Sequence, residues 1–469
     1  MHAVEGAEII FGIVIAYLVL TTVVSALSAK YANVTSSFMS PKNQLGPYLV
    51  GILLVSEHMA AASTLGSSQA AFEHGISASW VYISLGASFL VYGYLVAGKY
   101  NDTGEYTISG VINKKYGNNA RMMVSFMMAY AVLTVVVVGY TAGAVVVSSL
   151  MGISTTPAVW MMAVAVTISV AAGGLRGVGF ANLIHFLAKY FAIVITAVIA
   201  WSMLKARPDL SLDSLPAMNF SMTGIGLPTI IAWIIGNIGM TISTQHTIQA
   251  ISSLSSAKDA KKASLFACIW LFPLGFVLAY IGMVAHLLFP TLKSVQAMPV
   301  FFKYMNPWLA GVAVSGILAV VFVTVQACIL GATALIMKDF YIPFVKPNEK
   351  NQIIAVRVLV VLCGLLPVPF ALYIPALLKT VFFARAIRTS IAVFALFMFY
   401  APQVGTKAGA TLGLVLSVVF TTVWFVLNNP FGIDNMYIAL VTPVVVMLLS
   451  HIFKKSYVNP TGPEMVAKS

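Results

Sequence analysis

The stretch "LGPYLVGILLVSEHMAAASTLGSSQAAFEHG", residues 45–75, decides the fold, because it is long enough to cross a membrane and polar residues interrupt its centre. Glu57 and His58 are adjacent in an otherwise apolar run. A charged side chain at mid-membrane costs at least about 2.5–3.5 kcal/mol, so it normally faces a cavity or a partner. Glu57 therefore predicts a functional site within the membrane, with a structural ion pair or a position at a helix end as the alternative. His58 is expected in the same site, or as a hydrogen-bonded packing residue.

The composition is that of a membrane protein. Of the 469 residues, 60% are hydrophobic and 8% are charged, whereas soluble domains contain roughly 25% charged residues. Apolar runs of about 20 residues, the length that crosses a bilayer, recur along the chain. The sequence predicts an all-α membrane protein with thirteen transmembrane helices, at residues 8–28, 46–72, 78–98, 121–149, 157–173, 177–204, 224–253, 262–289, 306–337, 354–374, 376–400, 408–428 and 436–453.

The basic residues predict the orientation in the membrane. The formal net charge is +13, and 18 of the 26 Lys and Arg residues fall in loops on one side of the predicted helices, against five on the other side. The positive-inside rule then places the N-terminus outside and the C-terminus in the cytoplasm. Because the basicity follows the topology, we expect a small solute and the lipid bilayer of the cell membrane as partners, with no nucleic acid and no obligate protein partner. Cys268, Cys328 and Cys363 lack metal-site or redox spacing, so no cofactor is expected beyond a coupling ion.

A second interrupted helix matches the first. The stretch "GNIGMTISTQHTIQ", residues 236–249, is again polar and contains glycines within an apolar run. Two such helices in corresponding positions are typical of transporters with inverted repeats, in which unwound backbone binds solute and ions near the middle of the membrane. Close packing of helices through small residues is the alternative, and it explains the serines and glycines but not the charges.

Four motifs together resemble the sodium:solute symporter family. They are "LGPYLVG…" at residues 45–75, "GGLRGVGFANLIH" at residues 173–185, "STQH" at residues 243–246 and "ILAVVFVT…KDFY" at residues 317–341. They occur in the family's order and cover most of residues 45–345. The resemblance implies a five-plus-five inverted-repeat core of the LeuT type that works by alternating access. The expected parts are an extra N-terminal helix with a cytoplasmic loop (1–45), the first repeat (46–204), the second repeat (205–405) and two C-terminal helices with a tail (406–469).

The resemblance also implies an ion site, and this chain departs from it. In sodium-coupled members the ion binds backbone carbonyls that match Ser56, Met59 and Val320, together with two adjacent hydroxyl residues. Here these two positions are Val323 and Thr324, so one hydroxyl is missing. A valine side chain offers no oxygen to a hard cation. Asn182 replaces the family's aspartate, a ligand of a second sodium site in some members.

Lys189 suggests what has taken the place of sodium. It lies four residues after His185 and seven after Asn182, so the three residues share one helix face. In the family's fold this face looks toward the ion site, where a tethered ammonium can substitute for sodium. A lysine that extends to the membrane surface is the alternative. With Glu57 as its partner, Lys189 favours proton-coupled or sodium-independent transport. The other possibility is a sodium-coupled symporter in which Glu57 is an additional ligand.

Arg385 and Arg388 suggest the class of solute. They are three residues apart within a predicted helix, and fixed cations that face a cavity favour an anion. We therefore expect the solute to be a carboxylate or an amino acid, bound by these arginines with His58, Gln245 and His246. Anchoring of the helix to neighbouring carbonyls is the alternative role. A solute sensor is disfavoured because no signalling domain is evident, and an enzyme is disfavoured because no H-E-x-x-H motif or nucleophile–base set appears.

Overall fold

The computed structural model describes residues 6–31, 46–105, 107–173, 178–373 and 377–452, and within these ranges every regular element is helical. The α-helices are α1 (Ala7–Tyr31), α2 (Pro47–His58), α3 (Ala61–His74), α4 (Trp80–Val91), α5 (Ala97–Thr103), α6 (Ile108–Tyr116), α7 (Asn118–Met151), α8 (Thr155–Gly173), α9 (Val178–Lys205), α10 (Leu227–Ser243), α11 (Gln245–Ser252), α12 (Ala257–Leu288), α13 (Pro307–Ile336), α14 (Ile342–Val345), α15 (Glu349–Leu365), α16 (Val368–Ala371), α17 (Leu377–Tyr400), α18 (Lys407–Val426) and α19 (Asn435–Ile452). Short 3-10 or π segments join several of them, among them η1 (Gly75–Ser79) and η8 (Met337–Tyr341).

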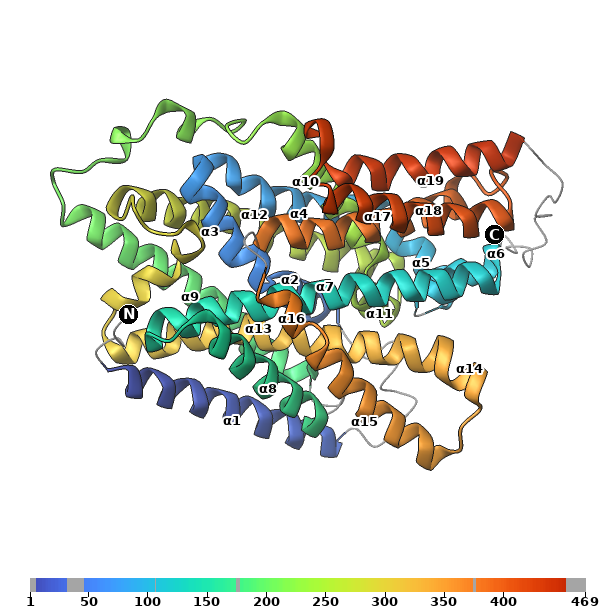
Figure 1. Ribbon diagram of the computed structural model, residues 1–469, viewed down its shortest axis with the longest axis horizontal. Coiled ribbons are helices and arrows are strands. Elements are labelled where there is room, and N and C mark those ends of the chain that lie inside the picture. The colour runs from blue at the N-terminus through green and yellow to red at the C-terminus, as the bar shows by residue number, and fades with distance from the viewer. Residues whose placement is uncertain (1–5, 32–45, 106, 174–177, 374–376, 453–469) are drawn as a thin grey trace.

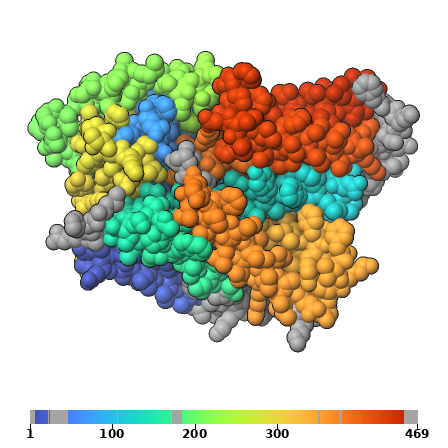
Figure 2. Space-filling view, in the orientation of Figure 1, coloured from blue at the N-terminus to red at the C-terminus, as the bar shows by residue number. Residues whose placement is uncertain are grey.

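Most of these helices run along the long axis of the molecule. In Figure 1, α1 begins at one end of this axis and α19 finishes at the other. Figure 2 shows the same face filled with atoms, with α1 at the lower left and α18 and α19 at the upper right. The side chains of many of these helices are exposed and apolar, including Ile168, Val194, Trp201 and Val445. Such a surface suits a hydrocarbon environment.

The described residues contain nine helical stretches long and apolar enough to cross a membrane, and the bent pair α10–α11 makes ten. Each of the thirteen predicted ranges overlaps at least one helix. One stretch, Ala61–Thr103, has 43 residues, about twice the length that a single crossing needs. It turns at Gly75, whose φ is +68° and where a Cβ would lie 2.1 Å from the carbonyl oxygen of Asn219. The helical prediction is confirmed, and the number thirteen stays a prediction.

Two of the helices are broken near their middle. After α2 the backbone leaves helical geometry at Met59, with ψ of 61°, and at Ala60, with ψ of 150°, before α3 begins. Thr244, with ψ of 125°, separates α10 from α11, which are bent by 53°. A break leaves carbonyl groups and N–H groups without their helical partners, so these groups are available to side chains, ions or solutes.

Most of α13 is buried in the core. It packs against α7, α9 and α1, while α12 packs against α2, α3 and α4, and α10 packs against α17. Gly316 lets α13 approach α9 closely, because a Cβ there would lie 2.3 Å from the carbonyl oxygen of Ala188. This contact is immediately beside Lys189, so the packing of α9 on α13 helps to fix where that lysine points.

Candidate functional site at the broken helices

The break after α2 is bound by a lysine from another helix. Lys189 of α9 is fully buried, and its Nζ donates to the carbonyl oxygen of Ser56 at 2.8 Å and to the Ser56 hydroxyl at 3.4 Å. In a continuous helix the Ser56 carbonyl would accept from the N–H of Ala60. Since Ala60 is extended, this carbonyl is freed by the break. The ammonium therefore satisfies an oxygen that the broken helix exposes.

Glu57 faces the second broken helix. Its Oε2 lies 3.7 Å from Nε2 of His246 in the first turn of α11, and this oxygen is buried without a hydrogen bond. Lys189 is within electrostatic range of Glu57 but does not form an ion pair with it at 4.0 Å or less. The predicted Glu57–Lys189 pair is thus an interaction at a distance, with His246 as the nearer neighbour of the acid.

His58 completes this group. Its Nδ1 donates to the carbonyl oxygen of Leu54 at 2.9 Å, because a carbonyl can only accept. Its Nε2 is buried without a partner, and its ring contacts those of His246 and Phe89 edge-on, at centroid distances of 5.3 Å and 4.8 Å. Glu57, His58 and His246 therefore form one cluster of titratable side chains where α2 and α11 meet.

The other side of Lys189 contacts the N-terminal helix. His185, one turn earlier on α9, is buried and shares a hydrogen bond of 2.6 Å with the hydroxyl of Tyr17 on α1. The side chain of Asn182 lies outside the described residues, so its predicted role stays a prediction.

The predicted ion-site residues of α13 are not linked by hydrogen bonds to the break after α2 in the described ranges. Val320 and Val323 are buried apolar residues, and the Oγ1 of Thr324 is buried without a hydrogen-bond partner. Within the described ranges, no hydrogen bond joins any of the three to Ser56 or Met59. Cys328, one turn after Thr324, is within electrostatic range of both Glu57 and Arg388, so this face of α13 looks toward the site.

Arg385 and Arg388 are buried on α17, with 3% and 5% of their surface exposed. Nη2 of Arg385 donates to the hydroxyl of Ser63 at 2.7 Å, in the first turn of α3. Arg388 is within electrostatic range of His58 and His246. The predicted arginines therefore do reach the break of the first helix.

Gln245 connects two helices at the start of α11. Its Oε1 accepts a hydrogen bond of 3.1 Å from the backbone N–H of Ile108, which ties the start of α11 to the start of α6. Its predicted place in the solute site stays a prediction.

Comparisons with known proteins show the family of this chain. Residues 38–417 match the family model described as "Sodium:solute symporter family". This chain belongs to the sodium:solute symporter family. Two relatives are sodium/proline symporters: that of Haemophilus influenzae is 23% identical over 86% of this chain and 85% of its own length, and that of Escherichia coli is 24% identical over 70% of both chains.

Solved transporters share the fold of this symporter. The structure titled as a substrate-bound, outward-open Na+-coupled sialic acid symporter superposes with a TM-score of 0.77, at 13% identity, over 96% of this chain and 98% of that one. Mhp1, a nucleobase-cation-symport-1 family transporter, superposes with a TM-score of 0.59, at 14% identity, over 89% and 94%. The LeuT-type fold expected from the motifs is confirmed, and the chain is a multi-pass secondary symporter rather than an enzyme.

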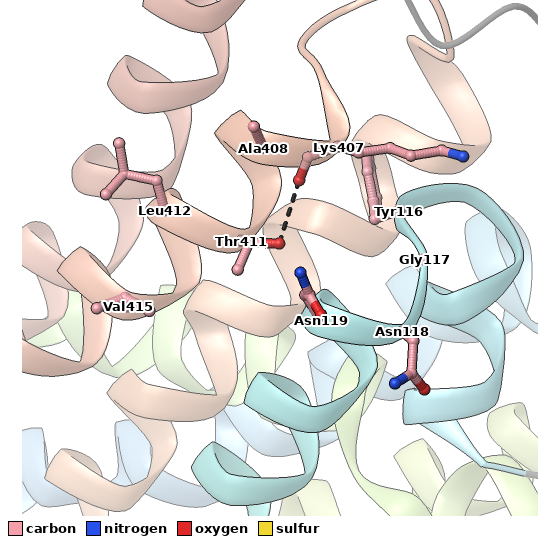
Figure 3. A pocket seen from close by; sticks show the side chains of 9 residues that line it. All are labelled: Tyr116, Gly117, Asn118, Asn119, Lys407, Ala408, Thr411, Leu412 and Val415. Atoms are coloured by element: carbon pink, nitrogen blue, oxygen red, sulfur yellow. Dashed lines mark hydrogen bonds between the residues drawn. The ribbon is translucent and has the colours of Figure 1, made fainter.

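The symporter also has a surface groove of 620 Å³ that is separate from these residues. Figure 3 shows it between the start of α7 and the first turns of α18, where Asn119 points toward Thr411. None of the candidate site residues lines it, and no group of three or more His, Cys, Asp or Glu residues in the described ranges could hold a metal ion.

Reasoning from the sequence did not identify several residues that lie in or beside the candidate site. Ser63 belongs to the polar run of the first broken helix, so its polar side chain could have identified it as a candidate site residue. The ring centroid of Phe382 lies 4.3 Å from Cζ of Arg385, and the ring of Trp233 stacks on that of Phe382 at a centroid distance of 5.3 Å. Apolar aromatic residues and Tyr17 give no sequence signal of this kind, because their contacts come from distant segments.

Proposed function

We propose that this symporter moves a small polar solute without sodium, and that protons exchanged at Lys189 and Glu57 drive it. The observation that carries the proposal is the hydrogen bond of 2.8 Å between Nζ of Lys189 and the carbonyl oxygen of Ser56. In sodium-coupled members of the family, the carbonyl at this position is expected to bind sodium. An ammonium group bound to the same oxygen supplies the positive charge that sodium would otherwise bring.

Electrostatic repulsion opposes the binding of sodium beside this ammonium. Two unit charges about 4 Å apart repel by about 4 kcal/mol at an effective dielectric constant of 20. That energy corresponds to a loss of about a thousandfold in sodium affinity. The repulsion is about as large as the whole binding energy of an ion held with a millimolar dissociation constant, about 4 kcal/mol, so it opposes a sodium ion at this carbonyl.

The remaining ligands support the same conclusion. Val323 offers no oxygen where the family has a hydroxyl, and only Thr324 retains one. Sodium would have to replace this lost ligand and also displace Lys189.

Protonation of Lys189 supplies a means of coupling. The protonated amine holds α2 to α9 through Ser56. When the amine loses its proton, this hydrogen bond loses its charge assistance and weakens, so α2 is held less firmly to α9. Glu57 lies at the end of α2 beside His246 of α11, so a movement of α2 also moves Glu57. Glu57 can then accept a proton in the other half of the transport cycle. The relatives named as sodium/proline symporters indicate a solute as small as proline.

Uptake by proteoliposomes tests the proposal. Purified protein is reconstituted and given radiolabelled acetate, lactate, succinate or proline, with a pH gradient in choline medium or with a sodium gradient at equal pH. We expect a pH gradient alone to drive accumulation of at least one of these solutes. Accumulation that requires sodium would overturn the proposal in favour of a sodium symporter with Glu57 as an extra ligand. Saturable binding without accumulation under either gradient would indicate a solute sensor.

A further inference from the structure

Two buried guanidinium groups lack an anionic partner. Arg385 and Arg388 lie three residues apart on α17, so they share one face of the helix. The Nε and Nη1 of Arg385 and the Nε of Arg388 are buried without hydrogen-bond partners. In the described part of the chain, no carboxylate forms an ion pair with either residue. Arginine stays protonated in proteins, so it cannot avoid the cost of burial by becoming neutral.

The surroundings of this pair also favour an anion. Ser63, which accepts from Arg385, lies in the first turn of α3, and α3 has no side-chain N-cap. The first N–H groups of a helix carry partial positive charge and lack intrahelical partners. In discontinuous transporter helices, such N-termini bind the anionic groups of solutes. The unpartnered guanidinium nitrogens are a second and independent indication of the same ligand chemistry.

The charge balance of the site disfavours an amino acid. Three cationic side chains, Lys189, Arg385 and Arg388, are buried around the break, and Glu57 is the acid beside them. Glu57 is already next to His246. The ammonium group of an amino acid would be repelled by the arginines that hold its carboxylate, and it would compete with His246 and Lys189 for the one acid.

We infer that the solute is a small carboxylate without an ammonium group, bound through its carboxylate by Arg388 and Arg385 at the start of α3. This inference rests on the proposed function, because it names the solute of the same transport site. A planar guanidinium matches the two oxygens of a carboxylate, and an ammonium does not provide that match. The aromatic pair Phe382 and Trp233 lies next to Arg385, with the ring of Phe382 against the guanidinium and the ring of Trp233 stacked on that of Phe382.

Binding to the purified protein tests the inference. Intrinsic tryptophan fluorescence and the thermal unfolding temperature are followed while choline acetate, choline lactate, choline succinate, proline, lactamide or choline chloride is added. Trp233 is the expected reporter, so a Trp233→Phe variant should lose the fluorescence signal and keep the thermal shift. We expect saturable binding of at least one carboxylate, and no comparable effect of proline, lactamide or chloride.

Two variants and one control test whether Arg388 binds the carboxylate. Arg388→Gln should weaken carboxylate affinity by at least about tenfold, as expected from the loss of a charge-assisted bidentate contact. Arg388→Lys keeps the charge, and its carboxylate affinity should lie between that of Arg388→Gln and that of the wild type. This variant keeps the test valid if the glutamine variant misfolds. Lys379→Gln is the control, because it removes a cation from the same helix whose Nζ donates to Oδ1 of Asn428. It should leave carboxylate affinity unchanged.

The outcomes separate this inference from the proposed function. Tighter binding of proline or lactamide than of every carboxylate, an equal effect of chloride, or unchanged affinity in both Arg388 variants would overturn the inference. The titrations are repeated in sodium medium. Carboxylate binding that requires sodium would overturn sodium independence and leave the solute class intact, whereas the absence of carboxylate binding in both media would overturn the solute class alone.

Discussion

Replacing Lys189 with methionine should uncouple transport while the protein stays folded. Methionine has a similar volume and no charge, so Lys189→Met removes both hydrogen bonds to Ser56. A hydrogen bond to a charged group contributes about 1.5–3 kcal/mol. Burial of an unpaired ammonium costs several kcal/mol, and its removal offsets this loss. We therefore expect little change in thermal stability.

The effect on coupling can be calculated. One proton that moves down a gradient of one pH unit releases about 1.4 kcal/mol, which supports at most about tenfold accumulation of a singly charged anion carried with it. In Lys189→Met this accumulation should fall to about onefold, since one of the two groups proposed to exchange the proton is gone. Exchange of labelled for unlabelled solute should remain, because it needs binding and alternating access but no net proton movement.

The assay uses proteoliposomes that contain a pH-sensitive dye. It measures proton entry and the accumulation of a radiolabelled carboxylate together. Lys205→Met is the matched control, because Lys205 lies at the end of the same helix, over the ring of Trp201 and away from the site. Accumulation by Lys189→Met equal to that of the wild type, with proton entry intact, would refute the coupling role of Lys189.

Three further predictions concern other contacts. Glu57→Gln should abolish accumulation driven by a pH gradient and preserve solute exchange in the same proteoliposomes; unaltered accumulation would make this acid structural. Tyr17→Phe removes the hydrogen bond of 2.6 Å to His185 and should lower the free energy of unfolding by about 1 kcal/mol, measured by thermal unfolding in detergent, with no change expected in sodium independence. The side chain of Asp339 is fully buried and accepts a hydrogen bond of 2.9 Å from Nε of Arg121. Asp339→Asn should therefore lower the free energy of unfolding by about 3 kcal/mol, the low end of the range for a buried pair, because Arg121 is partly exposed. An unchanged unfolding temperature would contradict this prediction.

The broken helices were predictable because composition alone identifies them. Polar residues that interrupt an apolar run, as in residues 45–75, are typical of discontinuous transporter helices, and the structure breaks this helix at Met59 and Ala60. The shared face of His185 and Lys189 was equally predictable, since it depends only on helical spacing. The number of crossings was not fixed by either argument, because helix breaks and turns divide apolar runs in ways that hydropathy does not register.

The partners of these residues could not be predicted in the same way. Lys189 donates to a carbonyl of α2 rather than to the Glu57 side chain, and the close packing of α9 on α13 at Gly316 lies beside this contact. Gln245 is used by the backbone of α6, a contact that joins residues 137 positions apart. Such pairings are set by tertiary packing, whereas sequence spacing reports only neighbours on the same helix.

Direct binding of radiolabelled sodium to the purified protein tests the central claim most directly. It is measured at equilibrium for the wild type and for a double variant, Lys189→Ala with Val323→Ser, which removes the ammonium and restores the missing hydroxyl. We expect no saturable sodium binding by the wild type at any pH at which Lys189 is charged, and a gain of saturable binding in the double variant. Saturable sodium binding by the wild type, undiminished by the presence of Lys189, would contradict it.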